Sequence, residues 1–442
     1  MDSAAHVADL ARFVTASPSS YHAAHEVASR AEAAGFTRLV ESEDWTALGP
    51  GSRAVVLRDG AVIVVAVPGG ASAATPFRIV GAHTDSPGFK LKPKPTTAAA
   101  GWLQAGVEVY GGPLLNSWLD RELELAGRVV TRDGAEHLVR TGPYLRIPQL
   151  AIHLDRDVNS GLALDRQRHV QPVFGVGEVS AGDLVALLAQ HAGVAAGDVL
   201  GYDILTADTQ EPRAFGLDDA LFASGRLDNL SSVHAGLTAL LAAVDDTAPD
   251  TAPDTAAMDA GTGPDDAILV LAAFDHEELG SESRSGASGP FLADVLSRTG
   301  GALGAGPTEL ARAFARSWVV SADAGHAVHP NYPEKHDPAN RPQAGHGPLL
   351  KINANQRYAT DAHGAALWAR ASEAAGVPFQ EFVSNNTVPC GSTIGPLTAT
   401  RLGIRTVDVG VPLLSMHSAR ELVHVDDVTA LAAAATAFYR GA

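Results

Sequence analysis

Five short segments of this chain place an acidic or imidazole side chain where a strand-like run should end. The longest apolar run, Ala267 to Phe274, has the length of a buried strand, and acidic residues follow it directly. In open α/β sheets, functional sites form at the carboxyl ends of the strands. We therefore expect the side chains at these ends to converge. They are His83, Asp228, Glu278, Asp323 and His417.

Two histidines and three carboxylates are the ligand types that zinc, cobalt and manganese accept. One aspartate can bridge two ions with its two oxygens, and five ligands leave positions open for water. Each residue also has an ordinary explanation when it is taken alone. A histidine at a strand end is usually a surface or capping residue, and an aspartate before a helix, such as Asp228, is usually an N-cap. The pattern predicts a metal site only if the fold brings all five together.

Two further acidic positions lie beside these ligands. Asp85 follows His83 by two residues, so on an extended segment both side chains face the same way, and Asp85 could orient the ring. The alternative is a turn aspartate before Ser86-Pro87-Gly88. Glu277 and Glu278 repel each other unless cations are present, and the alternative for this pair is a solvated turn. One can bind metal while the other acts as general base toward water. We assign Glu277 as base and Glu278 as ligand, an order that the pattern leaves open.

The remaining pattern indicates an α/β fold with an insert. From about residue 216, strand-like runs alternate with helical periodicity, which is typical of an α/β sandwich with a parallel or mixed sheet. Residues 96–215 hold short alternating runs with few helix signals, so we predict a β-rich insert there, and a catalytic domain made of 1–95 and 216–442. The predicted helices are 4–35, 228–244 and 426–439, the last capped by Asp426 or Asp427, and the predicted strands include 54–57, 61–67, 77–82, 267–274, 317–321 and 405–411.

Three segments read as loops. Residues 245–266 repeat Thr-Ala-Pro-Asp, which cannot bury much apolar surface, so we predict a flexible low-complexity loop within the catalytic domain. Gly300 to Gly306 is predicted to be a second loop. The turn from Gly391 to Pro396 precedes a predicted helix near Pro396, and its N–H groups could hold a substrate carbonyl or a product carboxylate, or merely punctuate the chain.

Charge and composition exclude several classes of partner. The 442 residues carry a net charge of −18, which argues against nucleic acid or an anionic membrane as a partner. The N-terminus reads as an amphipathic helix rather than a signal peptide, and no stretch approaches the roughly 20 apolar residues of a membrane span. The single cysteine, Cys390, allows no intramolecular disulfide, which fits a reducing compartment. We therefore expect a cytoplasmic protein.

Motifs along nearly the whole chain resemble those of the aspartyl aminopeptidase family, which belongs to the co-catalytic dinuclear zinc metallopeptidases. They are GAHTDSPGFKLKP (81–93), RIPQLAIHLDR (146–156), SGRLDNL (224–230), FDHEELGSES (274–283), SADAGHAVHPNYPEKH (321–336), LKINANQRYATD (350–361) and the stretch from Cys390 to Glu421. The resemblance implies a phosphorylase/hydrolase-like α/β/α sandwich as catalytic domain, with the inserted β-rich domain serving oligomerisation. It also implies two divalent ions per subunit, with zinc expected first and cobalt or manganese as alternatives.

The resemblance also assigns roles to individual residues. Asp228 bridges the two ions, His83 and Asp323 complete one site, and Glu278 and His417 complete the other. Glu277 is the general base, and Asp85 is the partner of the His83 ring.

Four further residues are implied to bind substrate. His326 and His329 lie near the substrate and the transition-state oxyanion, and Lys351 pairs with an acidic substrate side chain. His153 enters the active site of a neighbouring subunit in a tetrahedral dodecamer. From the residues alone, Lys351 reads as an exposed strand lysine and His153 as a surface histidine.

The expected function is a metallo-aminopeptidase that removes N-terminal Asp or Glu from peptides through a metal-activated water. One alternative is a metal-dependent deacylase or carboxypeptidase on the same fold, which would recognise a substrate carboxylate through an arginine such as Arg357 or Arg420. The other is a non-catalytic oligomeric scaffold. A requirement for a free N-terminus distinguishes the first alternative from the expected activity.

Overall fold

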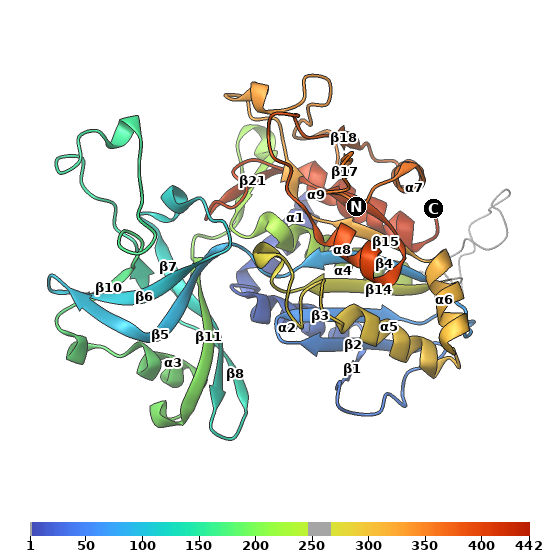
Figure 1. Ribbon diagram of the computed structural model, residues 1–442, viewed down its shortest axis with the longest axis horizontal. Coiled ribbons are helices and arrows are strands. Elements are labelled where there is room, and N and C mark those ends of the chain that lie inside the picture. Colours follow the sequence, from blue (N-terminus) through green and yellow to red (C-terminus); the bar gives the residue numbers. More distant parts are fainter. Residues whose placement is uncertain (1, 246–266) are drawn as a thin grey trace.

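The computed structural model describes residues 2–245 and 267–442. Figure 1 shows two parts, a sheet covered by helices and a smaller part built mainly from strands. The helices are α1 Ser3–Ala16, α2 Ser20–Ala33, α3 Leu184–Ala192, α4 Leu227–Asp245, α5 Phe291–Ala302, α6 Pro307–Arg316, α7 Ala362–Ala375, α8 Ile394–Leu402 and α9 Val425–Tyr439.

A nine-stranded mixed sheet forms the centre of the larger part. Its strands, in spatial order, are β1 Thr37–Leu39, β2 Arg53–Arg58, β3 Ala61–Ala66, β14 Ile268–Phe274, β4 Phe77–His83, β15 Trp318–Ala322, β19 Arg405–Gly410, β17 Leu349–Lys351 and β18 Gln380–Phe382. The four strands β14, β4, β15 and β19 are parallel to one another. Their carboxyl ends therefore lie along the same edge of the sheet.

Helices cover both faces of this sheet. Side chains of α1, α2, α4, α7 and α9 pack on one face, and those of α5, α6 and α8 pack on the other. Every residue of β14 is buried, because a strand covered on both faces can be apolar at each position. The expected α/β/α sandwich is thereby confirmed.

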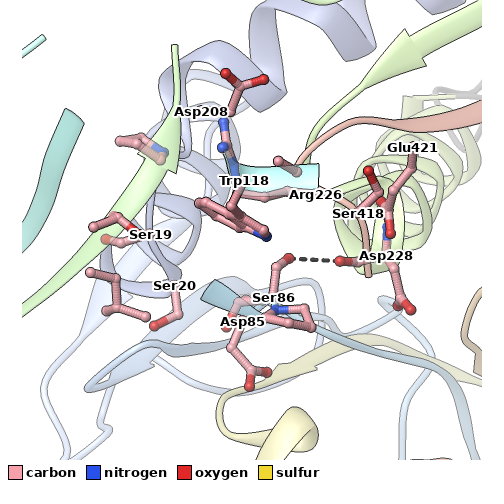
Figure 2. Close-up of a pocket in the computed structure, with 16 residues that line it drawn as sticks. Ser19, Ser20, Asp85, Ser86, Trp118, Asp208, Arg226, Asp228, Ser418 and Glu421 are labelled. Carbon is pink, nitrogen blue, oxygen red and sulfur yellow. Dashed lines mark hydrogen bonds between the residues drawn. The ribbon is translucent and has the colours of Figure 1, made fainter. Parts of the chain in front are cut away.

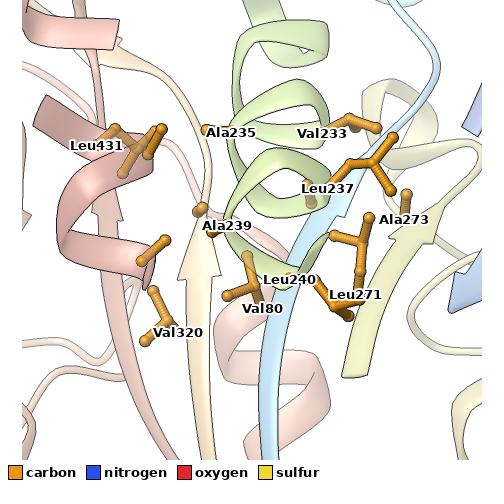
Figure 3. Close-up of a cluster of buried hydrophobic side chains, with 14 of the residues drawn as sticks. Val80, Val233, Ala235, Leu237, Ala239, Leu240, Leu271, Ala273, Val320 and Leu431 are labelled. Atoms are coloured by element: carbon orange, nitrogen blue, oxygen red, sulfur yellow. The ribbon is translucent and has the colours of Figure 1, made fainter. Parts of the chain in front are cut away.

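Helix α4 lies at the centre of the core. Figure 3 shows Leu237 and Leu240 of α4 packed toward Val80 of β4 and Leu271 of β14, with Leu431 of α9 on the other side of the helix. Among the described residues, α4 is the one helix long and apolar enough to cross a membrane, but 83% of its apolar window is buried inside the protein. Its apolar character is therefore explained by core packing.

A second, seven-stranded sheet forms the smaller part. Its strands are β5 Gly88–Ala99, β6 Trp102–Tyr110, β7 Glu122–Thr131, β8 Glu136–Arg140, β9 Leu145–Arg146, β10 Val173–Val176 and β11 Val199–Asp208. Because β11 pairs with both β5 and β7, the sheet closes on itself around a core of its own. The expected β-rich insert is present. Its sheet begins at Gly88, and the domain limits at 95/96 and 215/216 stay a prediction.

The described residues also form two small sheets. One contains β12 Arg213–Phe215, β13 Leu221–Ser224 and β21 Glu421–His424, and the other contains β16 Gly325–His326 and β20 Pro412–Leu413. Strands β13 and β21 are antiparallel, and Ser224 lies opposite Glu421.

The structure corrects three details of the sequence prediction. The helix predicted over 4–35 is two helices, since Pro18 removes a backbone donor between α1 and α2. The cap of α9 is neither Asp426 nor Asp427 but His424, whose Nδ1 accepts from the Asp426 N–H.

The third correction concerns Gly300–Gly306, because Gly300 and Gly301 belong to the last turn of α5. The predicted loop at 245–266 lies, from residue 246 onward, outside the described residues.

Candidate metal centre

Parallel strand order explains why distant parts of the sequence meet at one place. His83 is the last residue of β4, and in the sheet register it lies opposite Phe274, the last residue of β14. Asp323 directly follows β15, where Ser321 lies opposite Gly81. The acidic turn that follows β14 therefore lies on one side of His83, and Asp323 lies on the other.

Asp228 lies at the centre of the cluster. Its Oδ1 is 3.2 Å from Nε2 of His83, and its Oδ2 is 3.6 Å from Nε2 of His417. Asp323 Oδ1 lies 3.5 Å from the His83 nitrogen, and Glu278 Oε2 lies 3.4 Å from the His417 nitrogen. We call these five residues the metal cluster.

Among the described residues, three groups of potential ligands are found here; His83, Glu277 and Glu278 form one of them, and the other two share Asp228. His83, Asp228 and Asp323 form the first of these two, and Asp228, Glu278 and His417 form the second; the potential ligand atoms of each lie within 4.8 Å of one another. The structure therefore brings together all five side chains singled out in the sequence.

The electrostatics of the cluster fit bound cations. Burial, followed by the charge of Asp228, raises the pKa of Glu278 well above its usual range, and burial raises the pKa of Glu277 to about 8. Asp228 Oδ1 and Glu278 Oε1 are buried and accept no well-formed hydrogen bond from the described residues. Buried carboxylates without donors are costly unless positive charge is supplied. Divalent ions at these oxygens would supply it.

Glu277 and Glu278 lie on a short 3₁₀ turn, Glu277–Leu279, rather than on an extended segment. His276, with φ at +62°, turns the chain sharply after β14. Glu277 Oε2 lies 4.0 Å from Nε2 of His83 on the first side of the cluster, whereas Glu278 faces His417 on the second. The nearest histidine in the ion-pair contacts thus differs for the two carboxylates, although potential ligand atoms of both lie within 4.8 Å of His83.

Asp85 holds the first histidine and the glutamate turn together. Nδ1 of His83 lies 3.0 Å from the backbone oxygen of Asp85 and 3.4 Å from its Oδ1. The Asp85 carboxylate also accepts from the backbone N–H groups of Glu277 and Glu278 and from the hydroxyl of Tyr110. With Nδ1 directed to Asp85, Nε2 faces the ligand oxygens, which is the arrangement of metal-binding histidines.

His417 is oriented from the smaller part of the molecule. Its Nδ1 lies 3.0 Å from the backbone oxygen of Gly112, just after β6. Its backbone is left-handed, with φ at +66°, and its N–H donates to Glu421. Tyr110, Gly112 and Glu421 were not singled out from the sequence, because nothing in their local pattern shows that they face a distant ligand.

A small cavity lies behind Asp85 and Asp228. Figure 2 shows both residues on its wall, together with Trp118, Arg226 and Glu421. Its volume is about 30 Å³, enough for roughly one or two water molecules. The hydroxyl of Ser86 donates to the backbone oxygen of Asp228 across one side of it. The backbone of Asp228 is thus held by Ser86 on this side.

Of the four residues implied to bind substrate, Lys351 contacts the cluster. It is buried at the end of β17, where Nζ lies 3.9 Å from Oδ2 of Asp323 and donates to the backbone oxygen of Ala324. From the residues alone, Lys351 would be an exposed strand lysine, and that interpretation is wrong.

The three remaining histidines lie outside the cluster. His326 is exposed on β16, and His329 packs beside Tyr332 in the loop that follows. His153 is exposed on the long loop between β9 and β10, which protrudes at the upper left of Figure 1.

Of the two arginines considered for a substrate carboxylate, Arg420 donates to the backbone oxygens of Gln210 and Glu211. Arg357 is exposed.

Comparison with known protein families shows which family the chain belongs to. The family model described as aminopeptidase I zinc metalloprotease (M18) matches residues 13–439. The chain belongs to the M18 family. The "Probable M18 family aminopeptidase 2" of Streptomyces avermitilis is 54% identical over 439 residues, covering 99% of this chain and 98% of the relative. The protein of the same name from Mycobacterium leprae is 45% identical, covering 98% of each.

Solved M18 structures have the same fold as this chain. A cryo-EM structure of an Ape4 and Nbr1 complex superposes with a TM-score of 0.92 at 34% identity, covering 99% of this chain and 86% of that one. A structure of the S. cerevisiae mApe1 dodecamer superposes with a TM-score of 0.82 at 27% identity, covering 98% and 95%. The M18 chain is a metallo-aminopeptidase of a zinc-dependent family, and the resemblance to aspartyl aminopeptidases, which are part of M18, is confirmed.

Proposed function

We propose that this M18 chain removes N-terminal Asp or Glu from peptides at a centre with two divalent ions that share Asp228. One observation carries the two-ion part of the proposal: the two carboxylate oxygens of Asp228 face different histidines, at 3.2 Å and 3.6 Å. If Asp228 bound a single ion, possible ligands would be required beside only one of its oxygens, whereas they lie beside both. Zinc is the expected ion, with cobalt or manganese as alternatives.

Each part of the site has a chemical task. Bound divalent ions would polarise the scissile carbonyl and lower the pKa of water. His83 and Asp323 hold one side of the centre, and Glu278 and His417 hold the other. Glu277, whose side chain is 17% exposed and faces His83, is placed to reach a water at the cluster. As general base its Oε2 takes the proton of the attacking water and then delivers it to the amine that leaves when the C–N bond breaks.

Preference for acidic N-termini is proposed from Lys351. It is a buried ammonium 3.9 Å from Asp323, and the cluster around it is otherwise rich in carboxylates. Such a site repels an acidic substrate side chain unless a cation receives it. His326, on β16, and His329, in the loop that follows, are the proposed contacts to the substrate and to the developing oxyanion.

The chain is further proposed to be cytoplasmic and to assemble into a homo-oligomer, with a tetrahedral dodecamer as the expected form. The mApe1 relative is a dodecamer, and the loop that carries His153 exposes the apolar side chains of Leu150, Ile152 and Leu154. Exposed apolar side chains grouped in one loop are typical of an interface. His153 would then reach the site of a neighbouring subunit.

The test uses peptides that differ only in the first residue: Asp, Glu, Leu, Lys and N-acetylated Asp. Each is incubated with the purified protein, with chelator, and after zinc, cobalt or manganese is added back. The proposal expects release of Asp and Glu from free N-termini only, loss on chelation and recovery with metal. Preferred cleavage of the Leu or Lys peptide contradicts the acidic pocket, and cleavage of the acetylated peptide contradicts the aminopeptidase assignment.

A further inference from the structure

One buried carboxylate links two residues of the metal cluster through their backbones. Oε2 of Glu421 accepts the backbone N–H of Asp228 at 3.0 Å, and Oε1 accepts that of His417 at 2.8 Å. Glu421 is 2% exposed, and no basic group lies within ion-pair distance of it among the described residues. Its two oxygens therefore bind the ligand-bearing backbone and do not serve an ordinary salt bridge.

The position of Glu421 in the sheet makes this link rigid. Glu421 is the first residue of β21 and lies opposite Ser224, the last residue of β13. Asp228 follows Ser224 by four residues, and His417 precedes Glu421 by four. Both ligand-bearing segments thus leave the same end of one antiparallel strand pair, and the Glu421 side chain joins them there, beside Asp228 in Figure 2.

Both segments have backbone conformations that need support. Arg226 and His417 are non-glycine residues with φ at +59° and +66°, in the left-handed region that such residues rarely occupy. Such conformations persist when the surroundings fix them. A carboxylate that accepts from the N–H of His417 itself, and from that of Asp228 two residues after Arg226, supplies this restraint.

We propose that Glu421 is a positioning residue for the metal centre, which sets the spacing of Asp228 and His417 and thereby the metal affinity of their shared site. The inference rests on the proposed metal roles of these two residues. Two acceptor oxygens are essential to it. A glutamine has the same shape but one acceptor and an NH₂ group, so in Glu421→Gln one ligand N–H loses its acceptor and faces a donor.

The structure offers a matched control in Asp427. This buried carboxylate, in the first turn of α9, also accepts two backbone N–H groups, those of Gly345 and Gly347, each at 2.8 Å. Asp427→Asn makes the same chemical change away from the cluster. If Glu421 only stabilised the fold, the two variants would behave alike.

The experiment measures zinc affinity of chelator-treated protein by competition with a chromophoric chelator, the visible spectrum of the cobalt-loaded protein, and thermal stability without metal. Glu421→Gln is expected to weaken zinc binding about 10–100-fold, as is typical for residues that orient ligands, and to alter the cobalt spectrum. Asp427→Asn is expected to lower thermal stability and leave both metal readouts unchanged. Glu421→Asp, which keeps two acceptors on a shorter side chain, should fall between wild type and Glu421→Gln.

Two outcomes overturn the inference: wild-type affinity and spectrum in Glu421→Gln, or an equal loss of affinity in Asp427→Asn. The variant Asp228→Asn distinguishes a wrong role for Glu421 from a failure of the proposed function. If Asp228→Asn binds zinc as wild type does, the metal centre itself is misassigned. If Asp228→Asn loses zinc while Glu421→Gln keeps it, only the role of Glu421 is wrong.

Discussion

The phenolic hydroxyl of Tyr110 donates a 2.9 Å hydrogen bond to Oδ2 of Asp85. Tyr110 ends β6 of the smaller sheet, whereas Asp85 follows β4 of the large one and contacts Nδ1 of His83. Two residues after Tyr110, the backbone oxygen of Gly112 contacts Nδ1 of His417. The end of β6 and the residues after it therefore contact His417 directly and His83 through Asp85, so the smaller part of the molecule helps to orient both histidines.

Replacing Tyr110 by phenylalanine removes this hydrogen bond and leaves the ring in place. Because the acceptor is charged, we expect about a 10-fold loss in kcat, with KM for an Asp-initiated peptide nearly unchanged. Tyr202→Phe is the matched control, since its hydroxyl donates to the backbone oxygen of Lys92 within the same sheet. An equal effect of both variants would show a general effect on that sheet.

Glu277→Gln should abolish most activity without loss of metal. A glutamine cannot take the proton, and general-base catalysis typically contributes about 10²–10⁴-fold to the rate. Steady-state kinetics and metal analysis of the same preparation check both statements. Glu282→Gln, at an exposed position in the same loop, should behave as wild type. Near-normal turnover in Glu277→Gln would remove Glu277 from the mechanism.

Lys351→Met tests the acidic pocket through specificity rather than through rate. The ratio of kcat/KM for Asp-initiated over Leu-initiated peptides is expected to fall by about 30-fold or more, as loss of a buried charge pair costs ~2 kcal/mol or more. The ratio cancels losses common to both substrates, including any change in metal content. Lys92→Met on β5 is the control. An unchanged ratio would assign Lys351 to fixing Asp323 and Ala324 only.

Buried neutral histidines predict acid-sensitive stability. Burial, together with the neighbouring His234, lowers the pKa of His6 to about 3, so the unfolded chain binds this proton below pH 6.5 and the folded chain does not. Stability from this residue is present above pH 6.5 and is lost as the pH falls toward 3, at ~1.4 kcal/mol per pH unit.

Denaturant unfolding of chelator-treated protein at pH 7.5 and pH 5 measures this loss without interference from metal release. His6→Gln should reduce the difference between the two pH values by about 2 kcal/mol. His22, whose pKa burial lowers to about 4, contributes in the same direction and remains in the variant. An identical pH difference in wild type and variant would contradict a neutral His6.

Three of the five cluster residues could be placed from the sequence because they follow strand ends, whereas Asp228 lies in the first turn of α4 and His417 lies in the connection between β20 and β21. The run from Ala267 to Phe274 is apolar at every position, and its burial on both faces of the sheet explains why. Once β4, β14 and β15 are parallel, His83, Glu278 and Asp323 must lie at one edge. Chain alternation therefore predicted both the sandwich and the place of its site.

The residues that orient the ligands could not be predicted in this way. Tyr110 and Gly112 come from another sheet, and Glu421 acts through the backbone of residues that it meets only after β13 and β21 have paired. Such contacts depend on tertiary packing and leave no periodicity in the sequence. The same holds for Lys351, whose burial depends on the strands and loops around β17.

The most direct test of the two-ion centre is anomalous diffraction at the zinc absorption edge from crystals of the zinc-loaded protein. The arrangement around Asp228 predicts two anomalous peaks in each subunit, one held by His83, Asp228 and Asp323 and the other by Asp228, Glu278 and His417. A single peak on one side of Asp228, or peaks away from this carboxylate, would contradict it.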